Sequence, residues 1–159
     1  MSDTTDIPTL RRILKESRNI AIVGLSAKWF RPSNFAAKYL LDHGYRVIPV
    51  NPSYDEVLGQ KCFPRLADVP DAVDVVDCFR RSEDIVPLAR EAIDIGAKVL
   101  WMQLGVTSED AAKLARAAGL DVVMDRCMKI EYARLFGGLG FVGVNTKVIS
   151  AKRPMYLPY

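Results

Sequence analysis

Residues 22–33 read IVGLSAKWFRPS: an apolar run reaches Gly24 and then passes into a loop of polar, basic and aromatic residues. A buried strand that ends in a glycine turn before a helix is typical of the first unit of a parallel α/β fold. The glycine spacing of a dinucleotide site, G-x-G-x-x-G, is missing, because Gly24 is the one glycine of this loop. The stretch therefore predicts a strand–loop–helix unit with an unusual loop.

One pattern recurs three times after this stretch. Each copy is the end of a helix, a glycine, two residues and a valine that opens an apolar run: LLDHGYRVI at 40–48, AIDIGAKVL at 92–100 and ARAAGLDVV at 115–123. A glycine just past a helix end takes the left-handed backbone conformation that stops the helix. The repeat therefore predicts three helices, each followed within a few residues by a strand.

The predicted strands are near-continuous runs rich in Val and Ile, as in a parallel sheet buried on both faces. They span 19–24, 46–50, 74–79, 98–103 and 121–125. Alternation with helices predicts right-handed βαβ units, and so a Rossmann-like, doubly wound α/β fold with a mostly parallel five-stranded sheet in a single domain. We expect a leading helix within 1–18, this domain over 19–136 with a last helix at 128–136, and a tail at 137–159 that packs on the surface.

Polar residues mark three helix starts, namely Ser33 or Asn34, Ser82, and Thr107 or Ser108. Pro87 is awkward inside a helix, so we expect the second helix to begin later than its Ser82 signal suggests.

The composition is that of a globular protein, with 50% hydrophobic and 26% charged residues among 159 and a formal net charge of +3. Basic residues are interspersed with acidic ones, so no nucleic-acid partner is expected. No membrane span or signal pattern is evident, and we expect a cytoplasmic location and no membrane partner. Cys62, Cys78 and Cys127 are too far apart for a C-x-x-C site, so we predict neither a metal nor a disulfide framework.

Ligands of open α/β sheets bind outside the carboxyl ends of the strands, where the strand order reverses. This rule selects the loops at 24–33, 50–54, 78–81, 102–107 and 125–128. The first of these is the strongest candidate, because a helix N-terminus, two serines and two basic residues meet there: Gly24, Ser26, Lys28, Arg31 and Ser33. Such a set favours a phosphate group. Ordinary solvated charges with a capping serine are the alternative interpretation.

The other loops narrow the choice of ligand. A nicotinamide dinucleotide site needs an acid at the end of the second strand, where this chain has Val50 and Asn51, so a dinucleotide is disfavoured. In the third loop, Phe79 and the two arginines after it either contact a nucleotide or cap the strand and pair with Glu83 and Asp84. Gln103 in the fourth loop either bonds to an amide of a ligand or is structural.

The catalytic inventory is small. His43 lies in the last turn of a helix, where an imidazole is mostly a capping feature. Cys127 lies before a helix and beside Arg126, so it is either buried or a reactive thiol with a lowered pKa. Cys62 and Cys78 are interpreted as structural.

Six motifs occur in order over residues 20–135 and together resemble the CoA-binding protein family. They are GLSAKxxRPS, GYRVIPVNP, LGQKCFPRLADVP, VDCFRRSED, WMQLGV and VMDRCMKIE. The members are small stand-alone proteins similar to the N-terminal domain of the succinyl-CoA synthetase α subunit. The resemblance implies a Rossmann-like domain that binds CoA, with ADP over the first two loops and pantetheine across the third and fourth.

The resemblance also assigns the contacting residues by position. They are Gly24, Leu25, Ser26, Ala27, Lys28, Val50, Asn51, Pro52, Cys78, Phe79, Arg80, Gln103, Leu104 and Gly105. The predicted site also includes Arg31, Pro32 and Ser33 of the first loop. Synthetase chemistry is not implied. His43 lies inside the binding region, so it does not match the phosphorylated histidine of the synthetase's second domain, and the lysine after the synthetase's second strand has no counterpart near Pro52.

The sequence thus favours a module that binds CoA or an acyl-CoA, without catalysis of its own. The alternative is a small NAD(P)-binding oxidoreductase or redox-sensing regulator, in which Arg31 would accept a 2′-phosphate. A third hypothesis is a mixed disulfide between CoA and Cys127. A homodimer or another protein partner is possible in each case.

Overall fold

The computed structural model describes residues 6–136, along which helices and strands alternate. The helices and strands are α1 (Ile7–Glu16), β1 (Asn19–Val23), α2 (Pro32–Asp42), β2 (Arg46–Val50), β3 (Glu56–Val57), β4 (Gln60–Lys61), β5 (Val75–Cys78), α3 (Ile85–Asp94), β6 (Val99–Met102), α4 (Glu109–Ala117), β7 (Asp121–Val123) and α5 (Met128–Phe136). Short 3₁₀ turns lie at Leu66–Asp68 and Ser82–Asp84.

The main sheet has five strands in the order β2-β1-β5-β6-β7, and every neighbouring pair is parallel. This confirms the Rossmann-like fold that the sequence predicts. The chain proceeds outward from β1 to β2 and then returns to the other side of β1 with β5. The strand order therefore reverses between β1 and β5, and the carboxyl ends of these two strands flank the crevice where such folds bind ligands.

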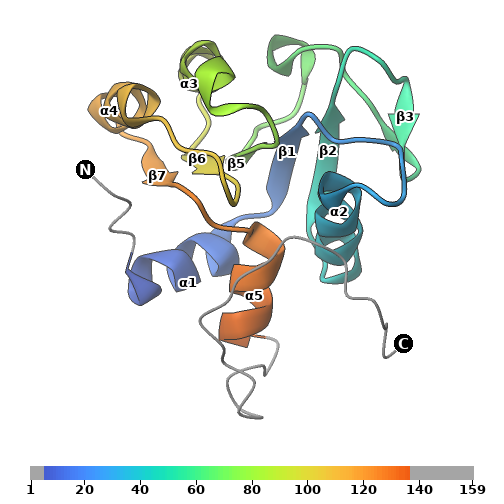
Figure 1. Ribbon diagram of the computed structural model, residues 1–159, viewed down its shortest axis with the longest axis horizontal. Coiled ribbons are helices and arrows are strands. Elements are labelled where there is room, and N and C mark those ends of the chain that lie inside the picture. The colour runs from blue at the N-terminus through green and yellow to red at the C-terminus, as the bar shows by residue number, and fades with distance from the viewer. Residues whose placement is uncertain (1–5, 137–159) are drawn as a thin grey trace.

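Helices cover both faces of this sheet (Figure 1). Helices α3 and α4 lie on one face, and α1, α2 and α5 lie on the other. Alternate residues of β1 serve the two cores: Ala21 and Val23 pack toward α3 and α4, while Ile20 and Ile22 pack on the opposite side. The leading helix α1 is part of this second core, to which it contributes Leu10, Ile13 and Leu14.

The helix boundaries follow local rules. The three predicted stop glycines, Gly44, Gly96 and Gly119, all have a positive φ, between 75° and 91°. The hydroxyl of Ser108 caps α4 by accepting from the main-chain N–H of Ala111. Helix α3 begins after the 3₁₀ turn and holds Pro87 in its first turn, where proline is tolerated.

Two details differ from the predictions. Helix α2 begins at Pro32 with Arg31 in the capping position, so Ser33 and Asn34 lie inside its first turn. The β3–β4 hairpin was not predicted, because its strands have only two residues each; both turn residues, Leu58 and Gly59, have a positive φ. The predicted tail at 137–159 lies outside the described residues. Within 6–136 no helix has the length and apolar character needed to cross a bilayer.

Candidate functional site

Gly24 closes β1 at the point where the strand order reverses. Its φ is +88°, and a Cβ built on it would lie 2.2 Å from the carbonyl oxygen of Phe79, which follows β5. No other residue type fits both conditions, since the backbone is left-handed and the obstacle is main chain. The aliphatic stem of Arg80 also lies over this position, at 3.5 Å from the built Cβ. Gly24 therefore brings the β1 and β5 loops into direct contact.

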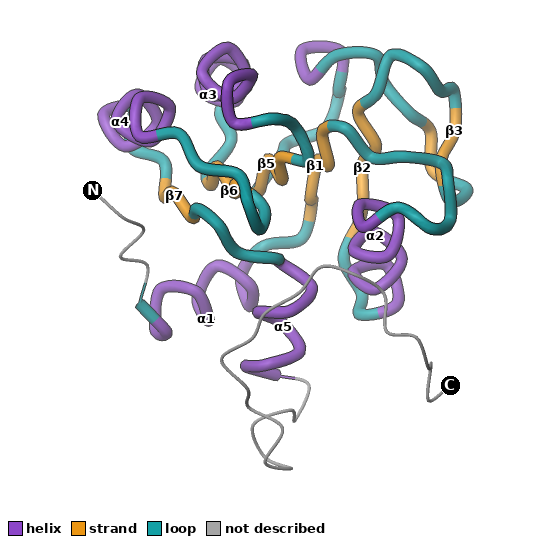
Figure 2. Tube along the Cα trace, viewed as in Figure 1, coloured by secondary structure: helices purple, strands orange, loops and turns teal. Residues whose placement is uncertain are grey.

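The β1–α2 loop, drawn in teal in Figure 2, is fixed by its own hydrogen bonds. The main-chain N–H of Ser26 donates to the hydroxyl of Ser33 at 3.0 Å, and the Asn34 amide donates to the carbonyl of Ser26 at 2.9 Å. The N–H of Lys28 donates to the hydroxyl of Ser26 at 3.1 Å. Ser33 is thus not a helix cap but a brace for the loop, and its hydroxyl keeps a proton to donate to a ligand.

A cavity of about 650 Å³ opens beside this loop. Its lining comes from three of the predicted loops: Gly24, Ser26, Arg31, Pro32 and Ser33 from the first, Phe79, Arg80 and Arg81 from the third with Asp84, and Gln103, Leu104 and Val106 from the fourth. The volume is in the range of small-molecule and cofactor sites. The sheet's switch point thus carries a ligand-sized cavity where the sequence places one.

A second cavity of about 410 Å³ adjoins the first, and Arg80 and Asp84 line both. It lies between the ends of β1 and β2 and the start of α3, and its lining includes Val23, Val50, Pro52, Pro64, Arg65, Leu66, Pro87, Leu88 and Glu91. Val50 and Pro52 of this group are predicted from the sequence, whereas the residues from 64 to 66 and from α3 are not. Pro64, Arg65 and Leu66 lie within the motif LGQKCFPRLADVP, but only the folded chain shows that they line this cavity.

The cations of the site differ in their pairing. Arg81 pairs with Glu83 at 3.4 Å and with Asp84 at 3.2 Å, so its charge is largely compensated. Arg31 and Arg80 line the larger cavity, and Arg31 lies over the Phe30 ring at 5.5 Å. Lys28 is exposed and lines neither cavity. Arg31 and Arg80 are thus the cations placed to meet an anion.

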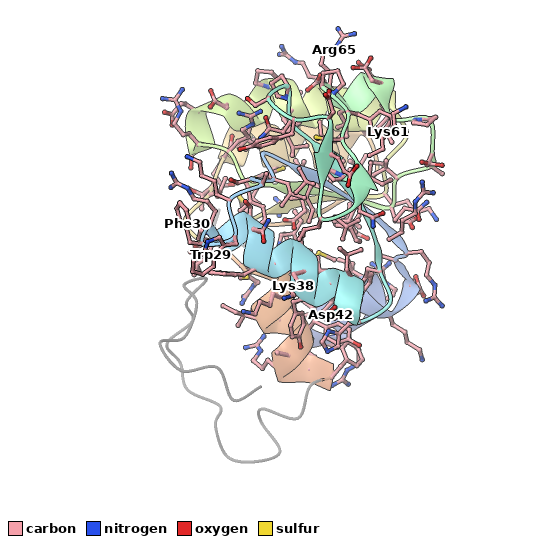
Figure 3. The ribbon with its side chains drawn as sticks, turned by 90° about the vertical axis from the view of Figure 1, so that its right-hand side faces the viewer. Trp29, Phe30, Lys38, Asp42, Lys61 and Arg65 are labelled. Atoms are coloured by element: carbon pink, nitrogen blue, oxygen red, sulfur yellow. The ribbon has the colours of Figure 1, made fainter. Side chains whose placement is uncertain are left out.

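Two aromatic side chains form the exposed rim of the same loop. Trp29 and Phe30 make an edge-to-face pair with ring centroids 6.0 Å apart, beside the start of α2 (Figure 3). They are 68% and 52% exposed, respectively. The loop therefore presents a large apolar surface next to its cations.

The end of β2 holds no acid. Asn51 occupies the position, and its amide donates to the carbonyl of Leu25 at 3.1 Å while its oxygen accepts from the N–H of Ser53 at 2.9 Å. The side chain thus ties the β2 loop to the β1 loop. A ribose 2′-hydroxyl would find no carboxylate here, as the sequence predicts for this position.

A buried polar pair lies under the fourth loop. Asp77 of β5 is fully buried, and it accepts a hydrogen bond from the side-chain amide of Gln103, which is 2% exposed. Burial raises the pKa of Asp77 to about 7, and the Gln103 bond offsets only part of this effect. The sequence signal that could have predicted this pair is an aspartate inside the apolar run VVDC.

The structure distinguishes the two interpretations of Cys127. Cys127 does lie next to the N-terminus of α5, but it is 1% exposed, and burial raises the pKa of its thiol to about 11. The main-chain N–H groups of Ile130 and Lys129 lower that pKa, but desolvation is the larger effect. Of the two interpretations, the structure supports the buried cysteine and not the thiol with a lowered pKa. Cys62 and Cys78 are also free and buried.

The remaining predicted residues lie around the cavities rather than in them. Leu25 and Cys78 are fully buried in the two cores beneath the loops, whereas Ala27 and Gly105 are exposed. His43 ends α2 as expected and stacks on Tyr39 with ring centroids 4.0 Å apart. In the described part of the chain, no group of three or more His, Cys, Asp or Glu side chains is arranged to hold a metal ion.

Comparison with known proteins identifies the family of this chain. A family model for the CoA binding domain matches residues 18–133. The chain belongs to the CoA-binding domain family. The match covers β1 to β7, and therefore every strand that contributes a loop to the two cavities.

Relatives of similar length and a larger enzyme are both found. Protein YneT of Bacillus subtilis, itself uncharacterised, is 40% identical over 124 residues, which are 78% of this chain and 92% of YneT. The structure of a hypothetical protein from Pyrococcus horikoshii has a TM-score of 0.80 at 44% identity and covers 86% of this chain and 100% of its own.

The larger relative is the dinucleotide-forming acetyl-coenzyme A synthetase 1 of Ca. Korarchaeum cryptofilum, solved in complex with phosphate and ADP. Its TM-score is 0.63 at 28% identity, over 73% of this chain but 27% of the synthetase chain. The family is thus related to the CoA-binding part of acetyl-CoA synthetase, and this chain corresponds to about a quarter of that enzyme.

Proposed function

We propose that this protein binds CoA or an acyl-CoA in the cavity at the switch point and catalyses no reaction of its own. The observation that carries the proposal is the lining of the larger cavity, in which the braced β1 loop, the first turn of α2 and the β5 and β6 loops meet. Membership of the CoA-binding domain family supports this choice of ligand.

The chemistry of the lining suits a nucleotide diphosphate. Arg31, Arg80 and the hydroxyl of Ser33 supply donors at one side of the cavity, where the positive end of the α2 dipole also lies. Charge-assisted bonds of this kind contribute about 1.5–3 kcal/mol each. Because hydrogen bonds fix the loop before any ligand arrives, little further ordering is needed on binding.

The opposite side of the cavity suits a less charged chain. Phe79, Leu104 and Val106 offer apolar contacts, and Gln103 offers an amide. The pantetheine arm of CoA, an alkyl chain with two amides, matches this mixture. We place the diphosphate against the β1 loop and the arm across the β5 and β6 loops, with the adenosine toward the second cavity.

Calorimetric titration with CoA, NAD, NADP and ATP tests the proposal. CoA should bind most tightly, and Arg31→Ala should weaken CoA binding about tenfold, the equivalent of one charge-assisted bond. Lys38→Ala is the matched control, because Lys38 is an exposed cation on α2 that lines neither cavity (Figure 3). Tighter binding of NAD than of CoA, with hydride transfer to a substrate, would instead establish the oxidoreductase alternative.

A further inference from the structure

The polar pair beneath the cavity has unused hydrogen-bonding capacity. Asp77 donates nothing when ionised, so the bond between the two side chains runs from the Nε2 of Gln103 to the Oδ1 of Asp77. The other oxygens of the pair, Oδ2 of Asp77 and Oε1 of Gln103, have no partner among the described residues. Unpaired buried oxygens are costly, and each one calls for an explanation.

The two residues differ in their position relative to the cavity. Gln103 lines the larger cavity, whereas Asp77 lies below it in the middle of the sheet, in register with Ile22 on one side and Trp101 on the other. The carboxyl of Asp77 therefore turns the amide nitrogen of Gln103 away from the ligand. The oxygen of Gln103 is the polar atom that this side chain has left to offer.

We propose that Asp77 is a positioning residue, which holds the amide of Gln103 so that its oxygen accepts a hydrogen bond from the ligand. This inference rests on the proposed function and adds a selection rule to it: the part of the cavity beside Gln103 takes an N–H or O–H donor and rejects a group that can only accept. In CoA the matching groups are the amide N–H groups of the pantetheine arm.

Calorimetry with two ligands separates this role from a structural one. CoA carries the arm, and adenosine 3′,5′-bisphosphate has the nucleotide without it. Titrations at pH 8.5 keep Asp77 ionised, above its pKa of about 7. Gln103→Met should weaken CoA binding about 3- to 10-fold and leave bisphosphate binding unchanged, because only the arm loses a hydrogen bond.

Asp77→Asn should have the same selective effect in a milder form. The asparagine side chain donates an N–H to the oxygen of Gln103, which turns that oxygen toward position 77. The amide N–H of Gln103 then faces the N–H of the ligand. The double variant D77N/Q103E reverses donor and acceptor within the pair: the asparagine donates to the glutamate, whose second oxygen again accepts from the ligand. CoA binding should therefore return to within about twofold of the parent protein.

Asp74→Asn is the matched control, because Asp74 lies just before β5 at the end remote from the cavity and accepts from the N–H groups of Arg18 and Asn19. It should not change the ratio of CoA to bisphosphate affinity. Equal losses for both ligands in D77N, or no recovery in a folded D77N/Q103E, would overturn the positioning role while CoA binding by the parent protein stands. Failure of the parent protein to bind CoA would instead overturn the proposed function, and the positioning role with it.

Discussion

Replacing Asp77 with asparagine should make the protein more stable above neutral pH, although the same change weakens CoA binding. The carboxyl of Asp77 is fully buried, and within residues 6–136 its one hydrogen-bond partner is Gln103. Desolvation raises its pKa from 3.8 to about 7. Between these two pH values the folded protein holds a proton at Asp77 that the unfolded chain has already released. Unfolding therefore becomes easier as the pH rises through this window.

The magnitude follows from the two pKa values. Each pH unit between about 4 and 7 should lower the free energy of unfolding by about 1.4 kcal/mol through Asp77, for a total on the order of 4 kcal/mol. Above pH 7 the effect is complete and the contribution stays constant. Asparagine has nearly the same shape and no charge, so D77N should be free of this loss while it keeps a hydrogen bond to Gln103.

Urea denaturation at pH 5, 6, 7 and 8 measures the effect as the difference in unfolding free energy between D77N and the parent protein. That difference should grow in favour of D77N up to pH 7 and then level off. Asp74→Asn is the control: burial acts to raise the pKa of Asp74, but bonds from Asn19 and Arg18 and the charge of Lys98 lower it overall. The contribution of Asp74 to the unfolding free energy changes only below about pH 4. The difference in unfolding free energy between Asp74→Asn and the parent protein should therefore stay constant from pH 5 to 8. A flat difference for D77N as well would refute the argument.

Three further predictions concern the site. Gly24→Ala should cost at least about 2 kcal/mol of unfolding free energy in chemical denaturation, because left-handed backbone strain adds to a 2.2 Å approach to the Phe79 carbonyl; wild-type stability would contradict this. Arg80→Ala should weaken CoA binding about tenfold and reduce the salt dependence of that binding. Lys28→Ala should change the affinity and its salt dependence by less than twofold each. Equal effects of the two variants would show that the cavity lining does not identify the residues that contact CoA. Cys127 should resist iodoacetamide at pH 8 in the folded protein, as judged by mass spectrometry, and rapid labelling there would contradict its burial.

The elements that the sequence predicts well are those governed by local chemistry. The stop glycines Gly44, Gly96 and Gly119 all have the left-handed backbone that ends a helix, and this conformation depends on the lack of a side chain rather than on distant contacts. The strand positions follow equally directly from the apolar runs, since a parallel sheet buried on both faces tolerates few polar residues. These two local signals were sufficient to predict the fold.

The loops that line the cavities could be predicted from the sequence, but not which side chains of a loop reach them. Arg31 lines the cavity and Lys28 does not, although both lie in the same loop with the same charge. The difference comes from the turn in which the N–H of Arg31 bonds to the carbonyl of Lys28 and from the start of α2 at Pro32. Likewise, Arg65 reaches the second cavity through contacts far apart in the sequence. The direction of a loop side chain and the contacts between residues far apart in the sequence are both set by the tertiary fold.

The missing dinucleotide fingerprint has a physical explanation in the length of the β1–α2 loop. In G-x-G-x-x-G the last glycine allows a helix to pack against the strand directly after the turn. Here the helix begins only at Pro32, and the position of that last glycine is held by Trp29, which is 68% exposed. The position of the middle glycine is held by Ser26, whose main-chain N–H and carbonyl are hydrogen-bonded to the side chains of Ser33 and Asn34. Gly24 meets the close approach of this loop to the Phe79 carbonyl, and in the function proposed above side chains rather than bare main chain contact the anion.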